Sequence, residues 1–181
     1  MARIQPVDPR TAGGEARQLL EAVHSGLGVT PNFTRVLAHS PAALAGFLGL
    51  YGGIGRASID LATRERIALA IAEDNECQYC VSAHTAIGRG AGLANDEMVL
   101  NRRGGSADAK AAAAVAFARA LNEHRGEVTA AEFEAVRRAG YGDAQIVEII
   151  AIVALNFLTN LIGKATQLDI DFPRVPLLEA A

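Results

Sequence analysis

Residues 61–90 read LATRERIALAIAEDNECQYCVSAHTAIGRG, and both cysteines of the chain lie in this stretch. Two helices are expected in it, near residues 60–74 and 76–91, on either side of a break at Asp74-Asn75. Elsewhere no run alternates apolar and polar residues for long enough to predict a strand. Only 5% of residues are aromatic and none is Trp, so alanine and aliphatic side chains must do the packing, which suits close-packed helices. The sequence therefore predicts an all-α fold.

The other helical patterns fill most of the remaining chain. They are expected near residues 10–26, 31–38, 41–55, 93–102, 106–124, 129–139 and 142–165. Thr30-Pro31 and Ser40-Pro41 each have the pattern of an N-cap followed by proline at the first helical position. Residues 1–9 are predicted to form an extended arm, and residues 169–181 an extended tail that clasps a neighbouring surface. Together, residues 1–181 are predicted to form a single compact multi-helix domain.

A weak internal repeat raises the possibility of two degenerate half-repeats. Leu61–Ala72 resembles Ala144–Leu155, with Glu65 aligned on Glu148. In that register Cys77, Cys80 and His84 fall opposite positions that hold Asn160, Gly163 and Gln167. Two helices rich in Ala, Ile and Glu also look alike by chance, so duplication and coincidence both stay open.

Composition excludes several classes of protein. The formal net charge is −3 and no basic cluster exceeds two adjacent arginines, so no nucleic-acid partner is expected. The longest uncharged stretch near the C-terminus, residues 149–163, is shorter than a membrane span and is predicted to be a buried core helix. No signal peptide pattern opens the chain. A disulfide between two cysteines three positions apart cannot cross-link distant segments as the disulfides of secreted proteins do. Redox or metal chemistry in the reducing cytoplasm is therefore expected.

The segment ECQYCVSAH, residues 76–84, places three reactive side chains on one helical face. Positions 77, 80 and 84 fall within about 60° of arc, and Cα atoms three positions apart suit a disulfide. His84 follows Cys80 by one helical turn and can therefore activate its thiol. Asn75 is predicted to be the N-cap with Gln78 as its capping-box partner, which would put Cys77 in the first turn, where the helix dipole favours a thiolate.

The dipole and the histidine favour different attacking thiols. The dipole favours Cys77, whereas a positioned base favours Cys80, because the imidazole both removes a proton and later delivers one to the leaving oxygen. We therefore interpret Cys80 as the attacking thiol. Glu65 lies among apolar residues on its own helix face, so its carboxylate is expected to be desolvated and to need a polar partner. His84 and Cys80 are such partners if the two helices pack antiparallel.

At these residues the chain resembles the alkylhydroperoxidase D (AhpD)-like peroxidase branch of the carboxymuconolactone decarboxylase superfamily. The branch pattern is a glutamate, eleven residues, then CxxCxxxH, which Glu65, Cys77, Cys80 and His84 match in full. The resemblance implies that Cys80 reacts with a hydroperoxide to give a sulfenic acid, that Cys77 resolves it as a redox-active disulfide, and that Glu65 and His84 relay protons. It also implies an all-α fold, no flavin, haem or metal, an unidentified thiol or dithiol reductant, and a homo-oligomer of three or six chains.

One position departs from the AhpD pattern. The residue before the second cysteine is Tyr79, where the pattern has histidine. Because the phenol of tyrosine has a pKa near 10, it cannot relay protons near neutral pH as histidine does. Tyr79 is therefore expected to pack over the CxxC turn or, less favoured, to donate a hydrogen bond to bound peroxide, and the relay is expected to be shorter or to serve another oxidant.

Other readings of the same residues stay open. Cys77, Cys80 and His84 would give three zinc ligands, but a structural zinc site needs a fourth, and no second cysteine pair exists. A lactone-acid decarboxylase of the same superfamily would lack the CxxC, and a redox-sensing oligomer would use it without turnover. Outside the motif, Glu148 is interpreted as a structural acid bound to an arginine or a backbone amide. Asn156 and Asn160 are expected to form hydrogen bonds across a helix interface.

Overall fold

The computed structural model describes residues 2–179, and these form nine helices and no strand. Residue 1 of the predicted arm and residues 180–181 of the predicted tail lie outside the described part. The predicted all-α fold is confirmed, and each expected helix is present within a few residues of its expected bounds. The helices are α1 (Gly14–Leu27), α2 (Asn32–Leu37), α3 (Pro41–Ile54), α4 (Leu61–Asp74), α5 (Gln78–Gly90), α6 (Asn95–Arg102), α7 (Ala109–Glu123), α8 (Ala130–Arg138) and α9 (Asp143–Thr166).

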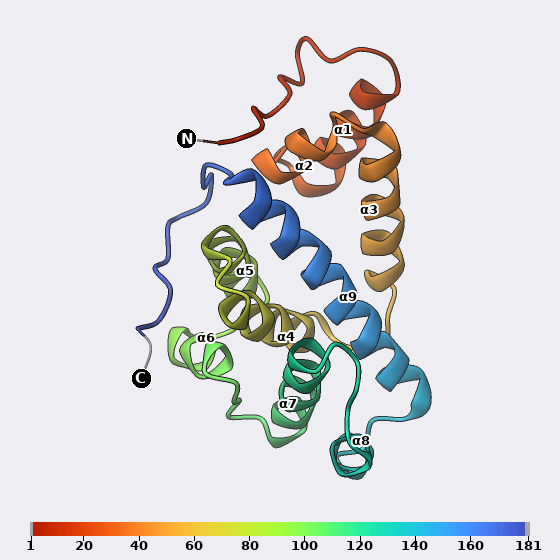
Figure 1. Cartoon of the computed structure of the whole chain (residues 1–181), viewed down its shortest axis with the longest axis vertical. Coiled ribbons are helices and arrows are strands. Elements are labelled where there is room, and N and C mark those ends of the chain that lie inside the picture. The colour runs from red at the N-terminus through yellow and green to blue at the C-terminus, as the bar shows by residue number, and fades with distance from the viewer. Residues whose placement is uncertain (1, 180–181) are drawn as a thin grey trace.

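The long helix α9 runs through the middle of the molecule, with α1, α2 and α3 on one side and α4, α5 and α7 on the other (Figure 1). Its two sides belong to two buried clusters. One joins α1, α2 and α3 to α5 and includes the two cysteines, and the other joins α4, α7 and α8 to α9. Each fully buried Leu or Ile in these clusters contributes roughly 1.5–3 kcal/mol by leaving water. The CxxC segment is thus held inside a packed core.

Helix α9 was predicted to be a core helix, and much of it is buried. Ile149, Ile152, Asn160 and Gly163 all face the interior. By length and mean hydropathy, 2.1 over eighteen residues, α9 could also cross a membrane, but 44% of that window is buried inside the protein. A core helix passes the same test of composition, so this burial favours the core interpretation.

Two predicted helix starts had different outcomes. Ser40 is the N-cap of α3, where its side chain accepts a hydrogen bond from the backbone nitrogen of Ala43, as expected. The Thr30-Pro31 prediction was wrong by one residue, because Pro31 itself is the N-cap and α2 begins at Asn32. The backbone nitrogen of Asn32 donates instead to Asp171 Oδ2 over 2.7 Å. The start of α2 is therefore capped by a residue of the distant C-terminal tail, which local sequence does not reveal.

The turn between α4 and α5 corrects another prediction. Asn75 is not the N-cap of α5 but the C-cap of α4, and its side-chain amide donates to Asn122 and Asn160. Glu76 takes a left-handed backbone conformation with φ 52° and reverses the chain. Cys77 then becomes the N-cap of α5, so Gln78 is the first helical residue rather than the third. The cause is that Asn75 is engaged by tertiary partners.

The described part of the tail clasps its own chain. Tail backbone groups at Val175, Pro176 and Leu178 bind side chains of α4, α5 and α6. In the arm, Arg3 donates from its backbone to Thr166 at the end of α9, and Val7 donates to Arg35 of α2. Both terminal segments are therefore fixed against the helical body, as predicted for the tail.

Candidate functional site

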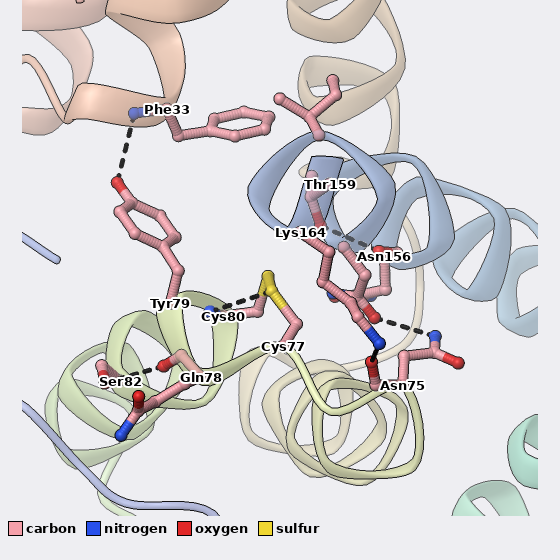
Figure 2. Close-up of a disulfide and its surroundings, with 12 residues drawn as sticks. Phe33, Asn75, Cys77, Gln78, Tyr79, Cys80, Ser82, Asn156, Thr159 and Lys164 are labelled. Carbon is pink, nitrogen blue, oxygen red and sulfur yellow. Dashed lines mark hydrogen bonds between the residues drawn. A yellow bond between two sulfur atoms is a disulfide. The ribbon is translucent and has the colours of Figure 1, made fainter. Parts of the chain in front are cut away.

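Cys77 and Cys80 form a disulfide at the start of α5, with Cα atoms 5.2 Å apart. Figure 2 shows this disulfide between the first turn of α5 and the neighbouring helix α9. Sγ of Cys77 also accepts a hydrogen bond of 3.3 Å from the backbone nitrogen of Cys80, so the cysteine itself caps the helix. The two cysteines thus have the expected spacing. Cys77, which was expected in the first turn, is instead the N-cap residue that precedes it.

The surroundings of the two sulfurs combine burial with the positive end of a helix. The exposed fraction is 1% for Cys77 and 4% for Cys80. Both residues lie at the N-terminal end of α5, where the helix dipole stabilises a negative charge, and Sγ of Cys77 accepts the N–H of Cys80. The helix end favours thiolates, which are the reactive form of cysteine, whereas burial opposes them.

Glu65 and His84 form the second pair of the site. Nδ1 of His84 lies 2.8 Å from Oε2 of Glu65, and both side chains are largely buried between α4 and α5. An ionised carboxylate only accepts hydrogen bonds, so beside an ionised Glu65 the hydrogen is on Nδ1 and Nε2 is left as the proton acceptor. The expected polar partner of Glu65 is therefore His84.

The structure brings together Cys77 with Cys80 and Glu65 with His84. Between the two pairs, no hydrogen bond from His84 to either sulfur occurs in the described residues of this disulfide form. The two pairs are linked through helix α5, in which His84 follows Cys80 by one turn. The direct Cys80–His84 contact thus stays a prediction for the reduced state.

Tyr79 is anchored away from the sulfurs. Its hydroxyl donates to Asp171 Oδ1 over 2.8 Å. It also accepts from the backbone nitrogen of Phe33 over 3.2 Å (Figure 2). Its ring packs edge-on against Phe172. Burial, followed by the nearby charge of Asp171, raises the pKa of Tyr79 well above its usual range. Tyr79 therefore packs against the tail residue Phe172, and its hydroxyl is already occupied by Asp171 and Phe33. Packing over the CxxC turn stays a prediction.

A groove of about 460 Å³ opens beside the disulfide and has Cys77 on its wall. Gln78, Gly163 and Lys164 also line it. Lys164 donates to the backbone oxygen of Asn75 over 2.6 Å and so crosses the mouth of the α4–α5 turn (Figure 2). The groove supplies a route from solvent to one of the two sulfurs.

No group of three His, Cys, Asp or Glu side chains suited to a metal ion occurs in residues 2–179. The predicted absence of a metal and of an organic cofactor remains a prediction.

Outside the motif, the side chains of Glu148, Asn156 and Asn160 form hydrogen bonds within the protein. Glu148 is partly buried and accepts hydrogen bonds from Ser58 and from the backbone nitrogen of Ile59, as predicted for an acid bound to backbone amides. Asn160 accepts from Asn75 across a helix interface, as predicted. The prediction for Asn156 was wrong, because its amide donates to the Ile152 oxygen of its own helix.

Sequence reasoning missed Gly163 as a neighbour of the sulfurs. A Cβ at this position would lie 3.1 Å from Sγ of Cys77 and 3.7 Å from Sγ of Cys80. The repeat register had placed Gly163 opposite Cys80, but no local signal indicated that the two helices meet there. The anchoring of Tyr79 by Asp171 was missed for the same reason, since the pair is 92 positions apart.

Comparison with known proteins bears on the family and the fold. The sequence model of the carboxymuconolactone decarboxylase family matches residues 41–123, which span α3 to α7 and include both pairs of site residues. A search of curated proteins gave no match.

Solved structures match nearly the whole chain. An uncharacterised peroxidase-related protein of Ralstonia eutropha JMP134 with an alkylhydroperoxidase AhpD core has a TM-score of 0.82 at 27% identity, covering 94% of this chain and 92% of its own. A peroxidase-related protein of Silicibacter sp. TM1040 has a TM-score of 0.78 at 25% identity, covering 91% of each chain. The debrominase Bmp8, as a cysteine-to-alanine variant with 2,3,4-tribromopyrrole, has a TM-score of 0.79 at 21% identity, covering 93% of this chain and 91% of its own. At that identity the last likeness shows the fold alone.

Proposed function

We propose that this chain, which belongs to the AhpD-like branch of the carboxymuconolactone decarboxylase superfamily, is a thiol peroxidase that reduces hydroperoxides with Cys77 and Cys80. The observation that carries the proposal is the pairing of a CxxC disulfide with a buried glutamate–histidine pair on the same two helices. The disulfide is the oxidised end state that such a reaction leaves. The glutamate–histidine pair is a means of moving the protons.

The reaction begins with the Cys80 thiolate. It attacks the outer oxygen of the hydroperoxide, the O–O bond breaks, and the departing alkoxide takes a proton from the imidazolium of His84. Cys80 is then a sulfenic acid. The Cys77 thiolate attacks its sulfur, the S–O bond breaks, and the oxygen leaves as water after receiving a proton. Two electrons have passed from the thiols to the peroxide, and an external thiol or dithiol returns them.

Three features support the assignment of roles. Cys80 is one helical turn from His84, whose Nε2 is free to exchange a proton when Nδ1 bonds Glu65. Cys77 accepts the backbone N–H of Cys80, which stabilises a thiolate that waits to resolve the sulfenic acid. Glu65 orients the imidazole and stabilises its charged form.

We further propose a cytoplasmic homo-oligomer. Helix α9 leaves an apolar stripe on its outer side, made of residues at helical spacing: Val147, Ile150, Phe157, Leu158 and Leu161. A second copy of the chain is the occupant that the family resemblance favours, in assemblies of three or six. The cytoplasm supplies the reducing conditions that return the thiols.

The test is a peroxide-consumption assay with several thiol and dithiol reductants, with thiols titrated before and after. The proposal predicts sustained turnover and the loss of two thiols per chain on oxidation, and Cys80→Ser is expected to abolish both. Oxidation by one equivalent without turnover under every reductant would indicate a redox sensor. Lactone-acid decarboxylation that survives Cys80→Ser would indicate the other branch of the superfamily.

A further inference from the structure

The two sulfurs of the disulfide are not equally placed for an incoming reductant. Cys77 lies on the wall of the groove of about 460 Å³, whereas Cys80 is not among the residues that line it. Cys77 is 1% exposed, and the groove on whose wall it lies gives a reductant a route to its sulfur. The groove also carries both signs of charge, with Lys164 lying 3.8 Å from Glu76 at its edge. The groove therefore discriminates between reductants by their shape more than by their charge.

Gly163 forms the part of the groove wall that faces the sulfur. Its missing side chain is significant, because a Cβ would lie 3.1 Å from Sγ of Cys77, closer than most Cβ contacts in proteins. Gly163 lies within helix α9, where glycine costs about 1 kcal/mol relative to alanine. Its backbone is not in the left-handed region, so conformation does not require glycine there. The space beside Cys77 is what glycine provides.

We propose that the reductant enters this groove and attacks Sγ of Cys77, and that Gly163 is a specificity-determining residue that keeps the approach open. This inference rests on the proposed function and defines how its cycle is completed. The thiolate of the reductant forms a bond to Sγ of Cys77, the Cys77–Cys80 bond breaks, and Cys80 leaves as a thiolate. A second thiol then attacks the reductant's own sulfur in the mixed disulfide and releases Cys77. The two electrons come from the two thiols of the reductant.

Attack at Cys77 restores the proposed catalytic thiolate in its first step. Exchange is faster when the leaving thiol is stabilised as an anion. Cys80 leaves in the first turn of α5, at the positive end of the helix dipole and one turn before His84. Attack at Cys80 would instead place the reductant on the sulfur that must meet the next peroxide.

The first test locates the mixed disulfide in the unaltered protein. The oxidised protein is exposed briefly to 2-mercaptoethanol, quenched with acid, alkylated, digested and sequenced by tandem mass spectrometry. The proposal expects the adduct on Cys77 and the alkyl group on Cys80. An adduct predominantly on Cys80 would overturn it.

The second test uses Gly163→Ala, with Gly49→Ala as the matched control. Gly49 also lies within a helix, and a Cβ there meets nothing within 4 Å. Starting from the disulfide, formation of the mixed disulfide in Gly163→Ala is expected to slow by about tenfold with glutathione and less with the smaller 2-mercaptoethanol. The control is expected to keep both rates. Equal slowing by both thiols, or no slowing, would contradict a steric role.

Failure of this inference is separable from failure of the proposed function. Both tests begin from the disulfide and need no peroxide, so they give a result even if the protein turns over no peroxide. If Gly163→Ala does not fold, the adduct position in the unaltered protein still decides the point.

Discussion

His84 Nδ1 lies 2.8 Å from Glu65 Oε2, although the two residues are nineteen positions apart and belong to different helices. The contact ties the chemistry of α5 to α4, and burial protects it from competing water. A buried carboxylate needs a hydrogen-bond partner, and here that partner is the imidazole of His84. The pair is therefore the part of the proposed relay that can be tested by changing a single atom.

Glu65→Gln keeps the size of the side chain and removes its charge. We expect the rate of Cys80 oxidation by peroxide to fall by roughly 10- to 100-fold, because the imidazole loses the carboxylate that orients it and stabilises its charged form. Stability should change by no more than about 1 kcal/mol. Stopped-flow oxidation kinetics and a urea titration measure the two effects.

Glu148→Gln is the matched control for that experiment. Glu148 occupies the aligned position of the possible second half and bonds Ser58 and Ile59 rather than a histidine. Its substitution should lower the stability of the protein and leave the oxidation rate unchanged. A fully active Glu65→Gln protein, or equal rate losses in both variants, would remove Glu65 from the relay.

Tyr79→Phe removes a hydroxyl that joins α5 to Phe33 and Asp171. Because a buried donor and a carboxylate lose their partner, we expect a loss of about 1–3 kcal/mol in unfolding free energy and faster hydrogen exchange in the tail. Tyr141→Phe is the control, since no hydrogen bond of its hydroxyl occurs in residues 2–179. Unchanged stability with a large loss of peroxide reaction would give Tyr79 a catalytic role instead.

The stability of the protein should depend on pH through Glu97. Burial opposes its ionisation, but hydrogen bonds from Ser106, Ala107, Asn101 and Arg66 outweigh burial and lower the pKa of Glu97 from 4.5 to about 2. Because the pKa of Glu97 is lower in the folded protein than in the unfolded chain, its ionised carboxylate stabilises the fold at pH values above the unfolded-state pKa. This contribution is lost as pH falls from about 4.5 to about 2.

Glu97→Gln should therefore destabilise the protein at pH 7 by roughly 3 kcal/mol and by progressively less toward pH 2. Urea titrations of both proteins across this range measure the difference. A difference that does not vary with pH would show that the stabilisation does not come from the ionised carboxylate.

The exposed stripe of α9 should mediate self-association. Leu161 is 52% exposed on this stripe, and a carboxylate at its position would be buried unpaired by a second copy. We expect light scattering after size exclusion to give three or six chains for the natural sequence and a single chain for Leu161→Glu. Arg10→Glu, in the turn between the N-terminal arm and α1, should leave the assembly intact. A natural protein that runs as a single chain would exclude the proposed assembly.

Much of the fold was predictable because helices are specified locally. The Ser40 cap, the breaks between helices and the CxxC face all follow from residues within one or two turns of each other. The start of α2 and the role of Asn75 were mispredicted, since each is decided by a distant partner, Asp171 in one case and Asn160 with Asn122 in the other. Likewise, Glu65 was predictable as an acid in need of a partner, but Gly163 became part of the site only through the packing of α9 on α5.

The most direct measurement uses the Cys77→Ser protein, which retains the proposed attacking thiol and lacks the resolving one. The reduced protein is treated with hydrogen peroxide in the presence of dimedone, and the label is located by tandem mass spectrometry. The proposed mechanism predicts a sulfenic acid adduct on Cys80, formed more slowly when Glu65→Gln is added. An unlabelled protein would contradict the assignment of Cys80 as the thiol that meets the peroxide.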